Sequence, residues 1–252
     1  MKWIRKEVLS GKPMAGTFLN LGSPITAEIA GRAGFDWVLI DMEHGAGAHS
    51  TLIHQLQAVA ATPAAPIVRI EWNEPPRFKR VLDLGPSGVM VPYVNNAGEA
   101  RQAVAAMRYP PAGVRGIAGF TPATHFGQEF KDYYAKADDA LVTILQIETA
   151  EAVANVTEIA AVEGVDVLFV GPLDLSVNLG HAGQFDHPEF RAAVTRVIEA
   201  CRDSGKIAGT LVMPDKIGQA IQDGYTFIAV GSEGGAVTSG LKSYAAAFEK
   251  YR

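Results

Sequence analysis

Short apolar runs alternate with longer helical segments along the whole chain. The runs are almost free of charge, which is typical of central strands covered on both faces of a parallel sheet. We predict eight such strands, at Ala15–Leu19, Trp37–Ile40, Ile67–Ile70, Val89–Val91, Leu141–Ile147, Val167–Val170, Ile207–Leu211 and Phe227–Val230.

The segments between these runs carry helix start and stop signals. Ser23 and Pro24 open the first and Gly34 ends it, while Asn73 with the following prolines opens a later one that Gly85 ends. Further helices are predicted at Ala48–Ala60, Ala97–Arg108, Thr149–Ile159, His187–Ser204, Pro214–Gln222 and Val237–Tyr251, with a short amphipathic helix in residues 1–10 that could plug a barrel.

Eight strand–helix alternations in 252 residues predict one α/β domain over residues 1–252, a (β/α)₈ TIM barrel. The alternative is a doubly wound sheet. That fold usually opens with a G-x-G-x-x-G turn after its first strand, and the sequence FLNLGS does not supply one.

Composition narrows the partners and the compartment. Hydrophobic residues make up 48% and charged residues 19%, which suits a compact core. The net charge of −5 argues against nucleic acid, and no apolar run reaches the ~20 residues that cross a bilayer. The single cysteine, Cys201, excludes an internal disulfide and fits a reducing compartment, so we expect a cytoplasmic protein.

Polar residues gather where the predicted strands end, which is where β/α barrels keep their active sites. Glu148 ends one strand, and Asp174 lies in an otherwise uncharged loop after another. Two hard oxygen donors suit Mg²⁺ or Mn²⁺ better than zinc, so we predict a metal site. The full inventory is Asn20, Asp41, Glu43, His44, Arg69, Glu71, Tyr93, Gln146, Glu148, Gly171, Asp174, Met213 and Ser232.

A histidine and an arginine share this rim. His44 follows Asp41 on a glycine-rich turn, and a nearby carboxylate makes imidazole more basic and prepares it as a general base. Arg69 ends a buried strand, where an unpaired guanidinium would be costly. It either binds a substrate carboxylate or enolate oxygen, or pairs with Glu148 or Asp174.

Three other features limit the chemistry. No lysine falls on a predicted strand, which argues against an imine mechanism. The GSEGGA stretch at Gly231–Ala236 could cradle a phosphate or could simply turn the chain. The irregular stretch Tyr109–Gln128, which includes Arg115, is either a lid or a subunit contact.

The motifs LIDMEH, LQIET and GPLDLS, together with RYPPAGVRG, resemble the HpcH/HpaI family of metal-dependent class II pyruvate aldolases. Its members include 4-hydroxy-2-oxoheptanedioate aldolase and 2-keto-3-deoxy-sugar-acid aldolases. The resemblance implies a homohexamer, or trimer of dimers, with an exchanged terminal helix. DMEHGA, GFTPATHFG and GSEGGAVTSG depart from the family pattern near the acceptor side, so the resemblance leaves the aldehyde unspecified.

The resemblance also assigns residues by position. Glu148 and Asp174 would be the metal ligands, for Mg²⁺ or Mn²⁺ with Co²⁺ as a further candidate. His44 would be the proton acceptor, tuned by Asp41 and Asp83. Arg69 would stabilise the enolate, while Gln146, Gly171, Leu173 and Asp174 would hold the pyruvate unit.

The predicted function is reversible cleavage of a 4-hydroxy-2-oxo acid to pyruvate and an aldehyde, a carbon–carbon lyase reaction. Three alternatives stay open. One is a related enolate barrel that acts on acyl-CoA thioesters or phosphoenolpyruvate. The others are a non-catalytic barrel that binds 2-oxo acids, and a purely structural protein.

Overall fold

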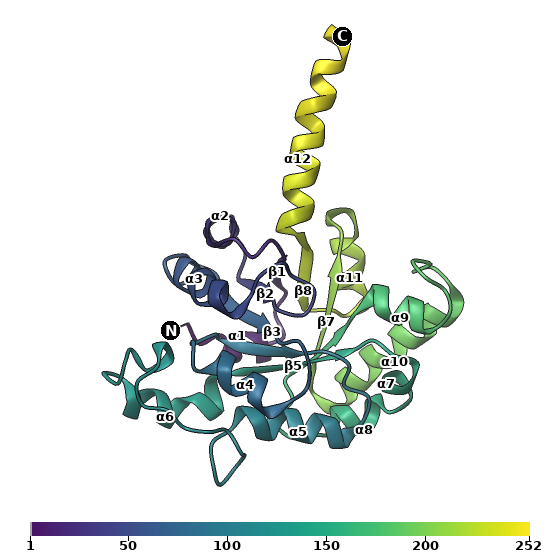
Figure 1. Ribbon diagram of the computed structural model, residues 1–252. Coiled ribbons are helices and arrows are strands. Elements are labelled where there is room, and N and C mark those ends of the chain that lie inside the picture. The colour runs from purple at the N-terminus through teal and green to yellow at the C-terminus, as the bar shows by residue number, and fades with distance from the viewer. Residues whose placement is uncertain (1) are drawn as a thin grey trace.

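The computed structural model describes residues 2–252, and within them eight parallel strands close into a barrel in the order β1 to β8 (Figure 1). Pairing of Met14 with Phe227 joins the first strand to the last. The eight predicted strands and the TIM-barrel class are confirmed. The strands are β1 (Met14–Leu19), β2 (Trp37–Asp41), β3 (Ala65–Arg69), β4 (Gly88–Val91), β5 (Val142–Ile147), β6 (Val167–Val170), β7 (Ile207–Val212) and β8 (Phe227–Ser232).

Helices surround this barrel, and most lie where the sequence predicts them. Their bounds are α1 (Arg5–Leu9), α2 (Pro24–Arg32), α3 (His49–Ala60), α4 (Pro75–Leu82), α5 (Ala97–Met107), α6 (Phe130–Ala140), α7 (Ala150–Ala154), α8 (Val156–Ala160), α9 (Pro172–Asn178), α10 (Pro188–Ser204), α11 (Ile217–Asp223) and α12 (Glu233–Phe248). Short 3₁₀ turns are η1 (Pro122–Thr124), η2 (Pro214–Lys216) and η3 (Glu249–Tyr251).

Two helices were not predicted. α6 buries only Tyr133 and Ala137, so its apolar stripe is too sparse to detect from periodicity. α9 is short, and Asp174, expected in a loop, lies in its first turn. Pro172 at the first helical position starts this helix, a role that proline's fixed φ favours.

The core has an inner and an outer part. Inside the barrel, the rings of Trp37 and Phe227 stack with centroids 4.1 Å apart. Gly16 makes this possible, because a Cβ there would lie 2.2 Å from the Trp37 ring. Ile4 and Val8 from the N-terminal segment join the same inner cluster, so this segment plugs the barrel as predicted; Met1 lies outside the described residues.

The stretch 109–128 lies at the amino ends of the strands, because it connects the end of α5 to α6 ahead of β5. The buried Arg115 guanidinium holds it, 4.5 Å from the ring centroid of Tyr109 and 5.3 Å from that of Tyr133. The backbone N–H of Ala123 donates to Asp83 O. This stretch is therefore not a lid over the mouth of its own barrel, and the subunit contact stays a prediction.

α12 begins at Glu233, earlier than predicted, and stands away from the barrel (Figure 1). Its side chains are almost all exposed, including Val237, Leu241, Tyr244 and Phe248. Within residues 2–252, no helix has the length and apolar character needed to cross a membrane.

Candidate active site

The Asp41 carboxylate organises the end of β2. Its Oδ1 accepts backbone N–H groups from Glu43 at 3.0 Å and from His44 at 3.1 Å, which folds the chain sharply after the strand. Gly45 completes the turn, since a Cβ there would lie 2.1 Å from the Asp41 carbonyl oxygen. The turn therefore presents Glu43 and His44 at the mouth of the barrel.

Arg69 lies beside Asp41 because the two are register partners on β2 and β3. Arg69 Nε donates to Asp41 Oδ1 at 2.9 Å and Nη2 donates to Oδ2 at 2.7 Å, a bidentate pair. Nη1 lies 3.0 Å from Glu43 Oε2 and 3.4 Å from Gln146 Oε1. The predicted alternative of pairing with Glu148 or Asp174 is wrong, because the adjacent strand offers Asp41 in register.

The Arg69 guanidinium keeps its positive charge beside Asp41 and Glu43. Burial acts to lower its pKa, but the hydrogen bonds and charge of Asp41, with the charge of Glu43, raise it above its ordinary value. Glu43 experiences the opposite balance. Burial raises the pKa of its carboxyl, and the nearby charges of Arg69 and His44 only partly offset this.

Glu148 is the most buried acid of the site, at 1% exposure directly after β5. Its Oε2 accepts from Gln146 Nε2 at 3.0 Å, and its Oε1 accepts from the Tyr93 backbone N–H at 2.8 Å. Tyr93 has a φ of 51°, a left-handed conformation that is strained for a residue with a side chain. Burial raises the pKa of Glu148 to about 7, an effect that the Tyr93 N–H opposes and the charges of Glu43 and Asp174 reinforce.

Asp174 reaches the same region from α9. Its charge raises the pKa of Glu148, of Glu43 and of the Tyr93 hydroxyl, so the Asp174 carboxylate lies close to these three groups. Gly171 lets β6 approach Glu148 closely, since a Cβ at this position would lie 2.4 Å from Glu148 Oε2. The side chain of Leu173, next to Asp174, is exposed at the rim.

These groups fit a hard divalent cation. Glu43, Glu148 and Asp174 concentrate negative charge against the single guanidinium of Arg69. Glu43 Oε2 is buried without a hydrogen bond, although it lies in ion-pair range of Arg69. Carboxylate oxygens in a cramped, partly desolvated mouth are donors that Mg²⁺ and Mn²⁺ prefer.

His44 lies at the rim with its side chain 63% exposed. Its Nε2 is 3.8 Å from Glu43 Oε1, while Asp41 bonds to its backbone and not to its ring. Glu43 is thus the acid beside the imidazole. Asp41 acts on His44 by fixing the turn that carries it.

Asp83 does not join this cluster. It caps the end of α4, at the amino ends of the strands, and its Oδ1 lies 3.8 Å from Arg115 Nη2. Within one chain it has no contact with His44, so the role implied for it would need Asp83 of a second copy.

Glu43 and Tyr93 belong to the strand-end residues that the sequence predicts, but the sequence alone assigns neither of them a role in the site. For Glu43 the signal was available, because it precedes His44 in the DMEH motif at a strand end. For Tyr93 it was not, since the contribution of Tyr93 is a backbone N–H whose direction depends on a left-handed φ.

In the glycine-rich stretch after β8, two backbone N–H groups that a phosphate would need are already bonded to side chains. Ser232 Oγ accepts the Gly235 N–H at 3.1 Å, and Asn20 Oδ1 accepts the Gly234 N–H at 3.2 Å. The Glu233 carboxylate, bonded to the Leu21 N–H, adds negative charge at the same helix start. The strands of the barrel also carry no lysine within the described residues, and the expectation against an imine mechanism stays a prediction.

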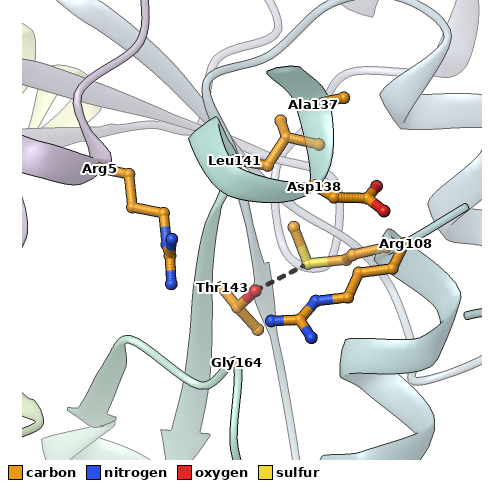
Figure 2. A pocket seen from close by; sticks show the side chains of 8 residues that line it. Arg5, Arg108, Ala137, Asp138, Leu141, Thr143 and Gly164 are labelled. Atoms are coloured by element: carbon orange, nitrogen blue, oxygen red, sulfur yellow. Dashed lines mark hydrogen bonds between the residues drawn. The ribbon is translucent and has the colours of Figure 1, made fainter. Parts of the chain in front are cut away.

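A small hollow shown in Figure 2 lies elsewhere, between α5, α6 and the amino ends of the strands. Arg5, Arg108 and Asp138 line it, but Arg5 is already paired with Asp166 at 2.9 Å. The hydrogen bond drawn there joins Thr143 Oγ1 to Met107 Sδ at 3.3 Å. None of the residues predicted to carry chemistry reaches this hollow, so the mouth of the barrel remains the candidate site.

Fold and site together define a (β/α)₈ barrel with a carboxylate-rich site at the carboxyl ends of its strands. The model of the HpcH/HpaI aldolase/citrate lyase family matches residues 14–239, and the chain belongs to this family. The predicted family is confirmed, and at family level so is the prediction of an aldolase-type carbon–carbon lyase.

Two kinds of relatives illustrate the similarity. The chain is 42% identical over 240 residues to a 4-hydroxy-2-oxo-heptane-1,7-dioate aldolase of Escherichia coli, covering 95% of this chain and 92% of the relative. It is similar to the crystal structure of an HpcH/HpaI aldolase/citrate lyase family protein from Burkholderia cenocepacia J2315, with TM-score 0.92, 36% identity and coverage of 99% and 98%. Citrate synthase SbnG is a further structural relative, with TM-score 0.88, 27% identity and coverage of 99% and 98%.

The raised pKa of Glu148 predicts a pH-dependent stability of the metal-free protein. The pKa of the Glu148 carboxyl is 4.5 in the unfolded chain, and burial raises this pKa to about 7 in the folded chain. Between these values the folded state binds more protons, so the free energy of unfolding falls as pH rises, by on the order of 3 kcal/mol. Glu148→Gln has no proton to release at this position and should show a smaller fall.

Urea midpoints measured across this pH range with a chelator present test this expectation. Glu151→Gln, at an exposed position on α7, is the matched control and should keep the wild-type slope. Equal slopes for wild type and Glu148→Gln would contradict the raised pKa.

Proposed function

We propose that the protein reversibly cleaves a 4-hydroxy-2-oxo acid to pyruvate and an aldehyde. The observation that carries the proposal is the convergence of Glu148, Asp174, Arg69 and His44 at one mouth, with Arg69 fixed by Asp41. The similar Escherichia coli protein, a 4-hydroxy-2-oxo-heptane-1,7-dioate aldolase, supports the same substrate class.

Glu148 and Asp174 would hold a divalent cation, Mg²⁺ or Mn²⁺ with Co²⁺ as a further candidate. When bound, such an ion polarises a keto group as a Lewis acid. Gln146 and the chain around Gly171 and Leu173 border these two acids and would position the 2-oxo acid.

Arg69 would stabilise the pyruvate enolate that forms as the carbon–carbon bond breaks. Asp41 holds Nε and Nη2, which leaves Nη1, near Glu43 and Gln146, as the nitrogen that could donate to a substrate oxygen. A fixed guanidinium needs little reorganisation as negative charge develops. His44, exposed at the rim, would take the proton of the C4 hydroxyl through a bound water.

Deuterium exchange at the methyl group of pyruvate tests the donor half without a choice of aldehyde. We expect chelator-treated protein to be inactive and added Mg²⁺ or Mn²⁺ to restore exchange, measured by NMR, because enolate formation needs charge stabilisation. Exchange without metal would instead favour an imine mechanism. No exchange under either condition would favour the barrel that binds 2-oxo acids without turnover.

Substitutions at the two basic groups test the assigned roles. We expect His44→Ala and Arg69→Ala each to lower turnover by ~10²-fold or more, the range that proton transfer and oxyanion stabilisation usually supply. The matched controls are His54→Ala on α3 and Arg77→Ala on α4, both at sites with exposed or half-exposed side chains.

Thermal melting separates chemistry from folding, because removal of Arg69 leaves Asp41 and Glu43 without their cation. Arg69→Lys keeps a charge but loses the bidentate geometry, and it should also lose activity while remaining folded. Near-wild-type turnover in His44→Ala or in Arg69→Ala would remove that residue from the mechanism.

We also propose that the protein assembles with copies of itself, as a hexamer or trimer of dimers, through α12. Val237, Leu241, Tyr244 and Phe248 recur at helical spacing on this protruding helix and are exposed. Ile25 and Ile29 on α2 expose a second apolar surface, at 73% and 64%. Two such surfaces suit mutual coverage between copies.

The single cysteine, Cys201, is buried and unpaired, which fits the predicted cytoplasmic compartment. Cell fractionation would test this prediction.

Charge placed on α12 should break this assembly. We expect Leu241→Glu with Tyr244→Glu to reduce the mass measured by light scattering, since carboxylates in an apolar contact are strongly unfavourable. Lys242→Glu on the same helix is the control and should keep the wild-type mass. A monomeric wild type, or an unchanged mass in the double variant, would contradict the proposal.

A further inference from the structure

We propose a second metal site, for a borderline transition ion such as Zn²⁺, formed by His181, His187 and Glu189 between α9 and α10. Among residues 2–252 this is the group in which three histidine or carboxylate donor atoms all lie within 4.8 Å of one another. It is distinct from the Glu148 and Asp174 pair, because it is built from the segment after α9 and the first turn of α10.

The three side chains already meet. His181 Nε2 and Glu189 Oε2 are 2.8 Å apart, and the rings of His181 and His187 lie with centroids 3.4 Å apart. Donor atoms around a tetrahedral ion with bonds of ~2.0–2.1 Å are separated by roughly 3.3 Å. The His181–Glu189 distance of 2.8 Å is below that value, and all three donor atoms lie within 4.8 Å of one another. Because the His187 ring is stacked on that of His181, it must rotate before both imidazoles bind one ion.

The backbone holds the two histidines in place. The His181 N–H donates to Ser176 O at 2.8 Å, and the Gly183 N–H donates to Ser176 Oγ at 2.9 Å. His187 is the N-cap of α10, and its Nδ1 accepts the Glu189 N–H over a long 3.3 Å. Such a long bond is weak and can be exchanged for a metal bond.

The donors are reachable from solvent. The His181 side chain is 24% exposed and that of Glu189 is 58% exposed. The fourth coordination position would therefore be open to water, as in zinc sites with three protein ligands.

Ligand chemistry distinguishes this site from the mouth of the barrel. Two imidazoles and one carboxylate suit Zn²⁺, Ni²⁺ or Cu²⁺, whereas carboxylates alone suit Mg²⁺ and Mn²⁺. We therefore expect the cluster to bind Zn²⁺ in the presence of excess Mg²⁺. An ion here would tie the segment after α9 to the start of α10.

Zinc titration of the chelator-treated full chain, followed by calorimetry in excess Mg²⁺, tests the proposal. The background variant is Glu148→Gln with Asp174→Asn, which removes the acids of the barrel mouth and should still bind one Zn²⁺. On that background, His181→Gln and His187→Gln should each weaken binding by at least about tenfold, since even groups that only orient ligands are worth that much. His54→Gln is the matched control and should leave binding unchanged.

Thermal melting supplies a readout that does not involve activity. Zn²⁺ should raise the melting temperature of the background variant and of His54→Gln, but not of His181→Gln, because an ion stabilises only the state that binds it. Equal melting of the metal-free variants shows that the substitutions leave the fold intact. Unchanged Zn²⁺ affinity in both His181→Gln and His187→Gln, or no Zn²⁺ bound by the background variant, would overturn the site.

Discussion

The buried pair of Asp41 and Arg69 is the interaction on which the site depends. Adjacent parallel strands bring the two residues into register, so the pair forms as the barrel closes. Removing one partner of such a pair typically costs about 3–5 kcal/mol, because the other charge stays buried. Asp41 also bonds to the N–H groups of Glu43 and His44, so the same carboxylate fixes the guanidinium and the turn beside it.

The rest of the mouth is arranged at the expense of stability. Burial raises the pKa of Glu43 and of Glu148, the charge of Asp174 adds to both shifts, and Tyr93 adopts a left-handed φ that directs its N–H at Glu148. Such features persist where the surrounding structure is firm enough to enforce them. The closely packed barrel interior, where the Trp37 and Phe227 rings stack over Gly16, is the rigid structure around the mouth.

Patterns in the sequence predict the features that depend on local composition. Apolar runs that are almost free of charge predict all eight strands, and position after a strand predicts Glu148 and Asp174 as converging acids. Features that depend on three-dimensional register were not predictable in this way. The partner of Arg69 is set by strand pairing, and Asp83 lies at the opposite end because α4 carries the chain back there. α9 was missed because its short span buries little apolar surface.

α9 connects the two proposed metal sites. Asp174 lies in the first turn of α9, near the acids of the mouth. Ser176, two residues later, accepts hydrogen bonds from the segment that carries His181. Because Ser176 Oγ also donates to Leu173 O, the histidine segment and the start of α9 share one hydrogen-bond network. Restraint of that segment therefore acts on the same short helix that positions Asp174. Different donor sets, oxygen at the mouth and mainly imidazole outside, would keep the two ions from competing.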